Sequence, residues 1–560
     1  MKNIYAEKAL EEIPRLLSCL DRNPFSPSYG CFNREYWLTR TRDFPDAIAQ
    51  FGTLSLALVW SFEFPGGQQY YKNPEIKKWI EASIRYWIKI QHSDGSFDEF
   101  YPNERGWAGP TGFLLYSMLR SYEVMENEFP NELKELFFKA VKKSAWFLAT
   151  REEPGVLANH HAMALLPVYQ SYHHLKKIDA EFANQLRSHF NDRMKSFLSY
   201  CDPEGWSLEY DGADPGYLSA TVSFLSKMQR YMDGTESWKG DVDGVIKRAI
   251  SFCSYFFYPN GSYGGTLGSR QTLHFYAHGF ELQSPSNSLA AALGDFGRQS
   301  LAEGKLVPPG IQDDRYYLYR IPELLEAYID SPSTPAQGTE MVAFQRAPFE
   351  QHFEHAKFYI KNTNNHYLLL NLAKGGVLKI YDKKTRALVF SDDGMVAQLE
   401  KGSRLTTQWI GEEYVIQQTG NDWSVTGNFH AIPYKYFNPI TMIAFRAFMI
   451  LTGWNAHVAE WIKGVIRNLL MTKASTSSIQ FERHFSFQDT EISIRNVIRS
   501  QKSIATLRIG GQFASRYVPQ SRYFQHEELQ NPYVTVLRPP LSHSFNTTFT
   551  LSGNNISNSS

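Results

Sequence analysis

Apolar residues recur with a helical period through the first part of the chain. Between residues 7 and 331 they return every three or four positions, as in Leu133, Phe137 and Val141, which is typical of amphipathic helices. Turns rich in Gly, Pro, Asp and Asn separate the segments. Many antiparallel helices in succession favour a helical bundle or an α/α toroid. The predicted helices are 44–63, 74–92, 108–126, 131–149, 159–175, 180–200, 217–232, 241–257, 286–303 and 315–329.

The pattern changes after a break rich in Pro and Ser, Ser331-Pro-Ser-Thr-Pro-Ala-Gln-Gly338. Beyond it, short apolar runs, some of them clearly alternating, lie between Gly, Asn and Asp turns, as expected for the strands of a β-sandwich. One stretch, 457–471, has a helical period, and we expect this helix to lie on the sheet. The predicted strands are 356–361, 366–371, 376–382, 387–391, 395–400, 404–410, 413–419, 423–427, 478–487, 490–498, 504–509 and 533–538.

These patterns predict a multidomain fold in which helices precede strands. Residues 1–335 are expected to form an α/α toroid, an incomplete helical barrel, and residues 336–552 an antiparallel β-sandwich. The polar residues 553–560 are expected to form a flexible tail. The length of 560 residues agrees with two or more domains, because a single hydrophobic core stops growing well below this size.

Charge, cysteine content and apolar runs argue against several classes of protein. Lys plus Arg and Asp plus Glu each number 57, so neither a nucleic acid nor an anionic membrane is the expected main partner. The 4 cysteines are scattered, unlike those of a zinc ribbon or a disulfide framework. The apolar run 440–452 is too short to span a bilayer and contains Arg446. The start shows no signal peptide, so we expect a soluble, cytoplasmic chain. Separately, neither a cofactor nor a metal is expected.

The densest group of polar residues lies between Gly205 and Ser219. It holds Glu209, Tyr210 and Tyr217 among Gly and Pro residues, directly before an apolar helix. Asp214 is placed to cap that helix, with a proline just inside its start. Acidic and phenolic groups on such a constrained loop are candidate catalytic or substrate-binding groups. A capped helix with two packing tyrosines is the alternative interpretation.

Two further segments offer candidate substrate contacts. The segment 33–43 carries Arg34, Trp37 and Arg40, which could clamp a carboxylated sugar, since Arg binds carboxylates bidentately. A salt-bridged loop that seals the toroid is the alternative. The loop 91–104 carries Glu99 among other acids, and an inverting glycosidase could place its acid and base there. A turn with local capping is the alternative.

Two histidine-containing segments complete the candidate site. Asn159 and His160 open a predicted helix, where donors and the positive end of the dipole suit an anionic group. A Gly-rich run then leads into a polar cluster. Two of its histidines are spaced i, i+4, which would suit a metal on a helix, but the His-Glu-x-x-His motif is absent and no metal is expected. The cluster consists of Arg270, His274, His278 and Glu281.

The order of a helical toroid and a β-sandwich resembles the heparinase II/III-like and alginate-lyase-like polysaccharide lyases. Asn159 and His160 look like the Asn-His pair that those lyases place at a helix start, and Tyr210 and Tyr217 look like the tyrosines of the following segment. Arg270 and His274 fall where further rim residues of such a site lie. The resemblance implies that Asn and His neutralise a uronate carboxylate and that Tyr moves a proton.

The residue types therefore predict a carbohydrate-active enzyme that acts on an acidic, uronate-containing polysaccharide by β-elimination. An aromatic content of 15% agrees with sugar stacking, although large aromatic cores would explain it equally. A uronyl C5-epimerase would use nearly the same residues. An inverting glycoside hydrolase would pair Asp94 or Glu99 with Asp211 or Asp214. A non-catalytic polysaccharide-binding or assembly protein is the remaining alternative.

Two structural expectations follow from this hypothesis. Asn159, His160, Tyr210, Tyr217 and Arg270 should meet in the central cleft of the toroid, within about ten Å of one another, because catalysis needs hydrogen-bond reach. The β-domain should pack on one rim of that cleft and should not be removable without loss of activity.

Overall fold

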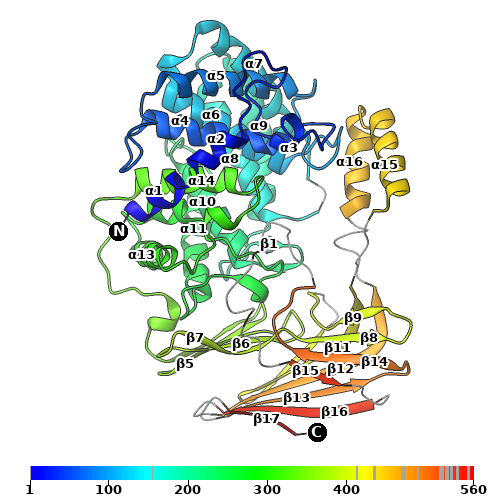
Figure 1. Ribbon diagram of the computed structural model, residues 1–560. Helices are drawn as coiled ribbons and strands as arrows, with labels where there is room; N and C mark the ends of the chain where they lie inside the picture. The colour runs from blue at the N-terminus through cyan, green and yellow to red at the C-terminus, as the bar shows by residue number, and fades with distance from the viewer. Residues whose placement is uncertain are drawn as a thin grey trace.

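The structure is a computed structural model that describes residues 2–153, 155–410, 414–432, 437–467, 475–488, 491–515, 523, 529, 534–537, 542–550 and 555–559. A helical part occupies one end of the molecule and a β-sheet part the other (Figure 1). The helices of the first part are α1 (Asn3–Leu10), α2 (Ile13–Cys19), α3 (Arg34–Trp37), α4 (Gly52–Ser61), α5 (Pro74–Ile90), α6 (Leu114–Met125), α7 (Asn131–Thr150), α8 (Ala158–Leu175), α9 (Ala180–Leu198), α10 (Pro215–Gln229), α11 (Lys239–Cys253), α12 (Ala277–Gln283), α13 (Ser288–Ala302) and α14 (Tyr317–Asp330).

The helices form an α/α toroid, as the sequence predicts. Its inner ring consists of α4, α6, α8, α10, α12 and α14, each packed on the next, and α14 also packs on α4, so the inner ring closes. Inner helix α4 is buried along nearly its whole length, which explains why its sequence is apolar on every side. Because an outer helix runs back between successive inner ones, the inner helices start at the same rim.

The β-domain consists of two antiparallel sheets. The first has five strands in sequential order, β3 to β7, and the second joins the remaining strands, with β10 paired to β11. β17 pairs with β16, so an edge strand lies in the tail predicted at 553–560. The strands are β3 (Phe349–Phe353), β4 (Phe358–Asn362), β5 (His366–Asn371), β6 (Val377–Asp382), β7 (Ala387–Asp392), β8 (Met395–Leu399), β9 (Arg404–Thr406), β10 (Val415–Thr419), β11 (Asp422–Ala431), β12 (Thr476–Phe487), β13 (Glu491–Arg499), β14 (Ile504–Gly510), β15 (Val534–Leu537), β16 (Ser542–Thr550) and β17 (Asn555–Ser559).

The five-stranded sheet is buried on both faces. Phe358 and Tyr367 face the core of the helical domain, whereas Tyr359 and Leu368 face the core shared with the second sheet. Strand β5 is therefore buried throughout, which accounts for its continuous apolar run. The sheet fastens the two domains into one body, and the predicted boundary at 331–338 lies in the connection between α14 and β3.

The helix expected on the sheet lies elsewhere. It is α16 (Ala456–Arg467), and it pairs with a second helix, α15 (Pro439–Thr452), that the sequence analysis did not predict. The hairpin lies beside the helical domain (Figure 1), where Phe445 packs on Tyr101 and the backbone carbonyl of Met449 accepts a 3.2 Å hydrogen bond from Asn103. The expectation of a helix on the sheet was wrong, because these long-range contacts with the toroid decide its place. Positions 468–471 of that prediction lie outside the described residues.

Candidate active site

The first turn of α10 places Tyr217 at the rim of the toroid. Asp214 caps this helix, as the sequence predicts: its Oδ1 accepts the backbone N–H groups of Gly216 and Tyr217 at 3.1 and 3.2 Å. Its Oδ2 accepts the backbone N–H of Arg270 at 2.9 Å. Asp214 therefore ties the helix start to the segment that carries Arg270, and its carboxylate is occupied by backbone donors.

Tyr210 lies at the tip of a tight hairpin beside that helix. The strands β1 (Leu208–Glu209) and β2 (Gly212–Ala213) pair, and the two turn residues, Tyr210 and Asp211, have φ of 51° and 75°. This left-handed conformation costs non-glycine residues roughly 1–2 kcal/mol each, and backbone strain of this kind is concentrated at functional sites. The turn brings the Tyr210 ring to 6.3 Å from the ring of Tyr217.

Asn159 joins this hairpin through Glu209. The Glu209 carboxylate accepts the backbone N–H of Asn159 at 2.5 Å and its side-chain amide at 2.7 Å. Glu209 is fully buried and Asn159 nearly so. Buried charge-assisted hydrogen bonds of this kind fix the orientation of the amide. Asn159 lies within the first turn of α8, so two inner helices present their N-terminal ends to the same place.

Arg270 covers the Tyr210 ring. Its guanidinium carbon lies 4.1 Å from the ring centroid, a cation–π contact, and only 2% of the residue is exposed. The β-domain holds the segment before it. Lys374 Nζ donates to the carbonyls of Thr266 and Gly268 at 2.7 and 2.6 Å, and Asn371 donates to that of Leu267 at 2.7 Å. The position of Arg270 thus depends on both domains.

Burial raises the pKa of the Tyr217 phenol well above its ordinary value, and the neighbouring Tyr210 adds to this effect. The Arg270 guanidinium acts in the opposite direction. Burial also raises the pKa of Asp214, against the backbone hydrogen bonds that lower it. Tyr217 is therefore a neutral phenol at neutral pH, and Arg270 is the neighbour able to make it more acidic.

His160 points toward a second group of charges at the same rim. Its Nδ1 lies 3.9 Å from one carboxylate oxygen of Glu153. The other oxygen of Glu153 lies 3.4 Å from Lys463 Nζ of α16. Lys463 also approaches Glu104 at 3.9 Å. Burial raises the pKa of Glu104 to about 7, while Lys463 opposes this shift. We call Glu104, Glu153 and Lys463 the rim cluster.

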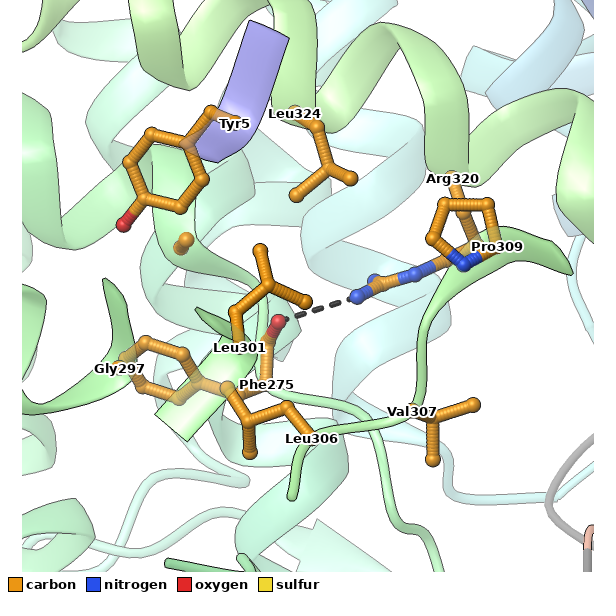
Figure 2. A pocket seen from close by; sticks show the side chains of 10 residues that line it. Tyr5, Phe275, Gly297, Leu301, Leu306, Val307, Pro309, Arg320 and Leu324 are labelled. Carbon is orange, nitrogen blue, oxygen red and sulfur yellow. Dashed lines mark hydrogen bonds between the residues drawn. The ribbon is translucent and has the colours of Figure 1, made fainter. Parts of the chain in front are cut away.

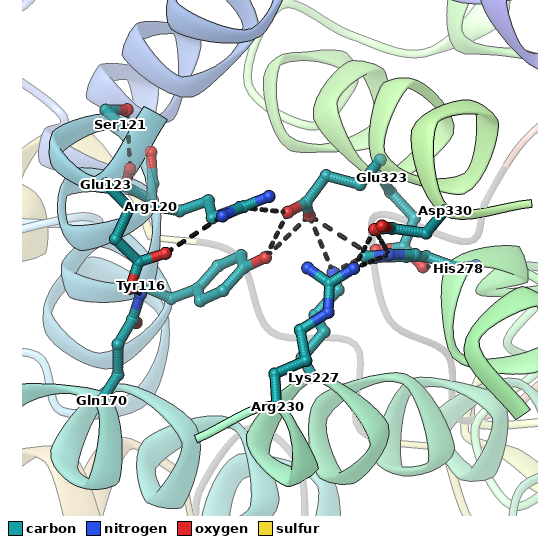
Figure 3. A network of polar contacts seen from close by, with 12 residues as sticks. Tyr116, Arg120, Ser121, Glu123, Gln170, Lys227, Arg230, His278, Glu323 and Asp330 are labelled. Atoms are coloured by element: carbon teal, nitrogen blue, oxygen red, sulfur yellow. Dashed lines mark hydrogen bonds and ion pairs between the residues drawn. The ribbon is translucent and has the colours of Figure 1, made fainter. Parts of the chain in front are cut away.

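His278 lies in a different environment from the residues above. It belongs to a buried network around α14, drawn in Figure 3, which we call the core network. Its backbone N–H donates to Glu323 at 3.1 Å and its Nε2 lies 2.7 Å from Asp330. Lys227 Nζ contacts Glu323 at 2.6 Å and Glu326 at 3.3 Å. Lys227 lies ten residues along α10 from Tyr217, roughly 15 Å away, so the structure separates His278 from the rim.

The other predicted contacts also have partners within the protein. Glu281 accepts hydrogen bonds from Tyr5 and Ser331, both at 2.9 Å, and pairs with Arg298. Glu99 pairs with Arg315, Arg34 with Asp314, and the Trp37 indole donates to the Cys19 carbonyl at 2.7 Å. Arg40 is exposed. These contacts favour the structural alternative, a salt-bridged rim, over a sugar clamp.

His274 precedes α12 and is not helical, so it shares no helix face with His278. Its ring lies 5.6 Å from that of Tyr523, a residue of the β-domain. A carboxylate–histidine group that could suggest a metal, His278 with Glu323 and Glu326, holds the ammonium of Lys227 against both carboxylates. A second group, Asp202, Glu204 and His355, joins the two domains, and both Glu204 oxygens accept backbone N–H groups.

The β-domain brings residues to this rim that the sequence analysis did not identify. A Cβ atom on Gly212 would meet Ile410 Cδ1 at 2.8 Å, so the segment at 409–410 lies against the Tyr210 hairpin. Next to Ile410, the Trp409 ring stacks on His430 with centroids 5.6 Å apart. His430 lies at a break in the register of β11, and such bulges are common next to active sites. That bulge is the signal by which His430 could have been found.

Two cavities in the described part of the toroid do not suit a polysaccharide as well as the rim does. The cavity in Figure 2 has a volume of about 20 Å³, and Arg320 on its wall donates to the carbonyl of Phe275 at 3.0 Å. That volume holds one water molecule, not a sugar ring. A groove of about 600 Å³ lies where α10 and α12 end, but Lys239 and Gln229 on its walls both bond Asp243.

Comparison with known proteins identifies the fold. No family model and no curated protein matches the chain. Among solved structures, the chondroitin AC lyase of Streptomyces coelicolor A3, in complex with chondroitin sulphate, matches 91% of this chain and 68% of its own, with 10% identity and a TM-score of 0.52. A heparinase III matches 91% and 72% of the two chains, with 11% identity and a TM-score of 0.45. The chain thus shares the toroid and β-sandwich fold of the chondroitin AC lyase, which confirms the predicted fold class and the resemblance at the level of the fold.

No described helix is both long and apolar enough to cross a bilayer.

Proposed function

We propose that this protein is a lyase-like enzyme that cleaves an acidic, uronate-containing polysaccharide by β-elimination at the rim where α8 and α10 begin. One observation carries the proposal: Tyr210, Tyr217 and Arg270 lie against one another, and Asn159 is fixed beside them by Glu209. The fold of known polysaccharide lyases supports the same conclusion at the level of architecture.

The chemistry assigns a role to each group. Elimination removes the weakly acidic C5 proton of the uronate and develops negative charge on the carboxylate. The Asn159 amide and the Arg270 guanidinium can stabilise that charge, an effect typically worth a few kcal/mol for each well-placed donor. Tyr217 is the group that moves the proton, and His160 at the same rim is a further donor.

The protonated phenol of Tyr217 suits one step of this reaction, the donation of a proton to the leaving group. Its pKa is raised, by burial first, so the phenol carries a proton that it can give to the departing glycosidic oxygen. Accepting the C5 proton, which then passes to the departing oxygen, requires that the phenol first lose its own proton to solvent and therefore needs a lower pKa. Closer approach of Arg270 during substrate binding would supply this, since the guanidinium already lowers that pKa.

Access to the site requires an opening between the domains. Arg270 is 2% exposed, and Ile410 lies against the hairpin that carries Tyr210. We infer that a polysaccharide reaches the guanidinium when Trp409 and Ile410 move away from Gly212. Loop movements that complete or uncover a site are common in enzymes.

Three of the four carboxylates considered for a hydrolase have other partners. Asp214 caps α10, Asp94 pairs with Arg105 at 2.8 Å, and Glu99 pairs with Arg315. A uronyl C5-epimerase would begin with the same proton removal at Tyr217 and remains the second candidate.

The test is an ultraviolet assay with heparan sulfate, chondroitin sulfate and alginate as substrates. The wild type should release an unsaturated, absorbing product from at least one polymer, and Arg270→Met should not. Arg15→Met is the matched control, because Arg15 stacks on Tyr317 at the same 4.1 Å but lies outside the site. New reducing ends without absorbance would indicate a hydrolase, and binding without any product would overturn the enzymatic proposal.

A further inference from the structure

The α15–α16 hairpin exposes an apolar face that is unusual for a protein surface. Nine of the 22 large, exposed apolar side chains in the described residues belong to this short segment. Ile440 is 80% exposed, Leu451 72% and Trp454 68%, and Trp461 of α16 continues the surface. The positions opposite the toroid, from Ile440 on α15 to Trp454 just beyond its end, hold Ile, Ala, Phe, Leu or Trp. We call this surface the outer face.

The opposite side of the hairpin already has its partner. Met449 and Ile462 are buried with Tyr101 of the toroid, Arg446 pairs with Asp43, and Lys463 reaches the rim cluster. The only charged side chain of α15 is therefore turned toward the protein. A globular helix usually buries one apolar face and exposes a polar one, whereas α15 carries apolar side chains on both.

The outer face has the area of an interface but lacks the polar groups of a protein interface. Its side chains offer on the order of 1,000 Å², since large aromatic residues alone carry about 150–250 Å² each. Protein interfaces of this size make about one hydrogen bond per 100–200 Å². The described polar side chains beside these apolar ones already have partners within the protein: Trp454 Nε1 donates to the Leu451 carbonyl at 2.8 Å and Thr441 Oγ1 to the Asn438 carbonyl at 3.0 Å. His457 Nδ1 lies 3.4 Å from a guanidinium nitrogen of Arg151.

We propose that the outer face of the α15–α16 hairpin docks on a lipid surface and inserts its side chains into the acyl region. A surface whose hydrogen bonds are satisfied internally is complementary to hydrocarbon, where unsatisfied polar groups are costly. The helices, 14 and 12 residues long, are too short to span a bilayer and lie along its interface. Trp454 and Trp461 are of the residue type that anchors at the headgroup level.

The charge of the face determines which lipids it binds. Among the hairpin side chains that the structure describes, the cations Arg446 and Lys463 are both paired with acids of the toroid and do not belong to the outer face. Attraction to anionic headgroups therefore contributes little, and docking depends on buried apolar area. Binding should be similar on neutral and anionic vesicles and should not weaken in high salt.

The experiment is flotation of the full chain with phosphatidylcholine vesicles, with or without phosphatidylglycerol, at low and high salt. Wild-type protein should float with both vesicle types at both salt concentrations. Ile443→Glu/Ile450→Glu should weaken the partition by at least about a hundredfold, because each large apolar side chain contributes about tenfold or more. Phe25→Glu/Ile178→Glu is the matched control, since these exposed apolar residues lie outside the hairpin. Circular dichroism should show that both variants stay folded.

Three results would overturn the proposal. The first is the absence of binding to any vesicle. The second is binding that needs phosphatidylglycerol and disappears in salt, because this would place the contact on another, basic surface. The third is a dimer, seen by analytical ultracentrifugation, that Ile443→Glu/Ile450→Glu dissociates, because the outer face would then be covered by a second copy of the chain.

Discussion

The two ends of α10 carry polar clusters that differ in the groups that compose them. Near its C-terminal end, Lys227 lies between Glu323 and Glu326, with both carboxylates at or below 3.3 Å. At its N-terminal end, Tyr217 and Tyr210 lie beside Arg270, and the carboxylate of Asp214 caps the helix. One cluster pairs opposite charges in the core, and the other places phenols and a guanidinium between two domains.

The two clusters therefore differ in expected role: the one around Lys227 stabilises the fold, and the one around Tyr217 is the candidate functional site. Lys227 holds the pKa of Glu326 well below its ordinary value despite the burial that raises it. Removing the ammonium of Lys227 or one of the carboxylates leaves a buried charge that is less well paired, so this cluster supports the fold. At the N-terminal end the pKa of Tyr217 is raised and the backbone at Tyr210 is strained. Shifted proton affinity and strain together are typical of functional sites.

The largest expected effect is on the rate of Tyr217→Phe. The substitution removes one hydroxyl and keeps the ring that packs on Tyr210, so folding and glycan binding should persist. Loss of the proton carrier should lower the elimination rate by roughly 10²–10⁴-fold. The measurement is the initial rate of product absorbance, with thermal unfolding as the check on folding.

Tyr210→Phe is the control for that assignment, because both phenols lie beside Arg270. A dead Tyr210→Phe with an active Tyr217→Phe would transfer the role to Tyr210. Two active variants would remove tyrosine from the mechanism.

The next effect concerns stability at the other end of the helix. Lys227→Met removes the ammonium that lies between buried Glu323 and Glu326, leaving Arg120 at 3.2 Å from Glu326, and should lower the free energy of unfolding by about 3–5 kcal/mol. Lys239→Met removes an exposed i, i+4 partner of Asp243 and should cost no more than about 0.5 kcal/mol. Denaturant unfolding compares them, and equal losses would contradict the distinction between the two clusters.

The rim cluster should make the free energy of unfolding depend on pH. Burial raises the pKa of Glu104 to about 7, so the folded state binds this proton more tightly than the unfolded state. Stability should therefore fall as pH rises from about 5 to 7, by at most about 1.4 kcal/mol per pH unit for this group. Glu326, whose pKa is lowered, loses its contribution only as pH falls below its ordinary value of 4.5.

Unfolding free energies at pH 5, 6, 7 and 8 for the wild type and Glu104→Gln measure this effect. The variant should show a flatter profile in this range. Parallel profiles would mean that Glu104 titrates normally in the folded protein.

The smallest expected effect is on the catalytic rate of Glu99→Gln. Glu99 is a paired rim residue in this account, so its loss should change the rate by less than about tenfold, whereas a catalytic acid or base contributes 10²–10⁴-fold. An inactive but folded Glu99→Gln would return the hydrolase interpretation to first place.

The sequence pattern predicted those elements that depend on contacts between residues close in sequence. The helical period located most of the toroid, and Asp214 with Pro215 identified the start of α10, because capping involves neighbours in sequence. The run 440–452 was recognised as apolar but not as α15. Its place beside the toroid depends on Tyr101, which is distant in sequence.

Partnerships between distant residues could not be predicted. Arg270 and His278 look alike in sequence as members of one polar segment, yet one stacks on Tyr210 and the other contacts Glu323. Which of them reaches the rim depends on where α12 begins and on the clamp by Lys374. The roles of Asn159, His160, Tyr217 and Arg270 in catalysis stay predictions until variants are measured.

Elimination at Tyr217 is tested most directly by the mass of the products that the wild-type protein forms in D₂O from a uronate polymer on which it acts. The account predicts fragments with an unsaturated uronate at the new end, lighter by one water than hydrolytic fragments and absent with Tyr217→Phe. Fragments that have gained D₂O would show hydrolysis, and an uncut polymer that carries deuterium at C5 would show epimerisation. Either result would contradict elimination at Tyr217.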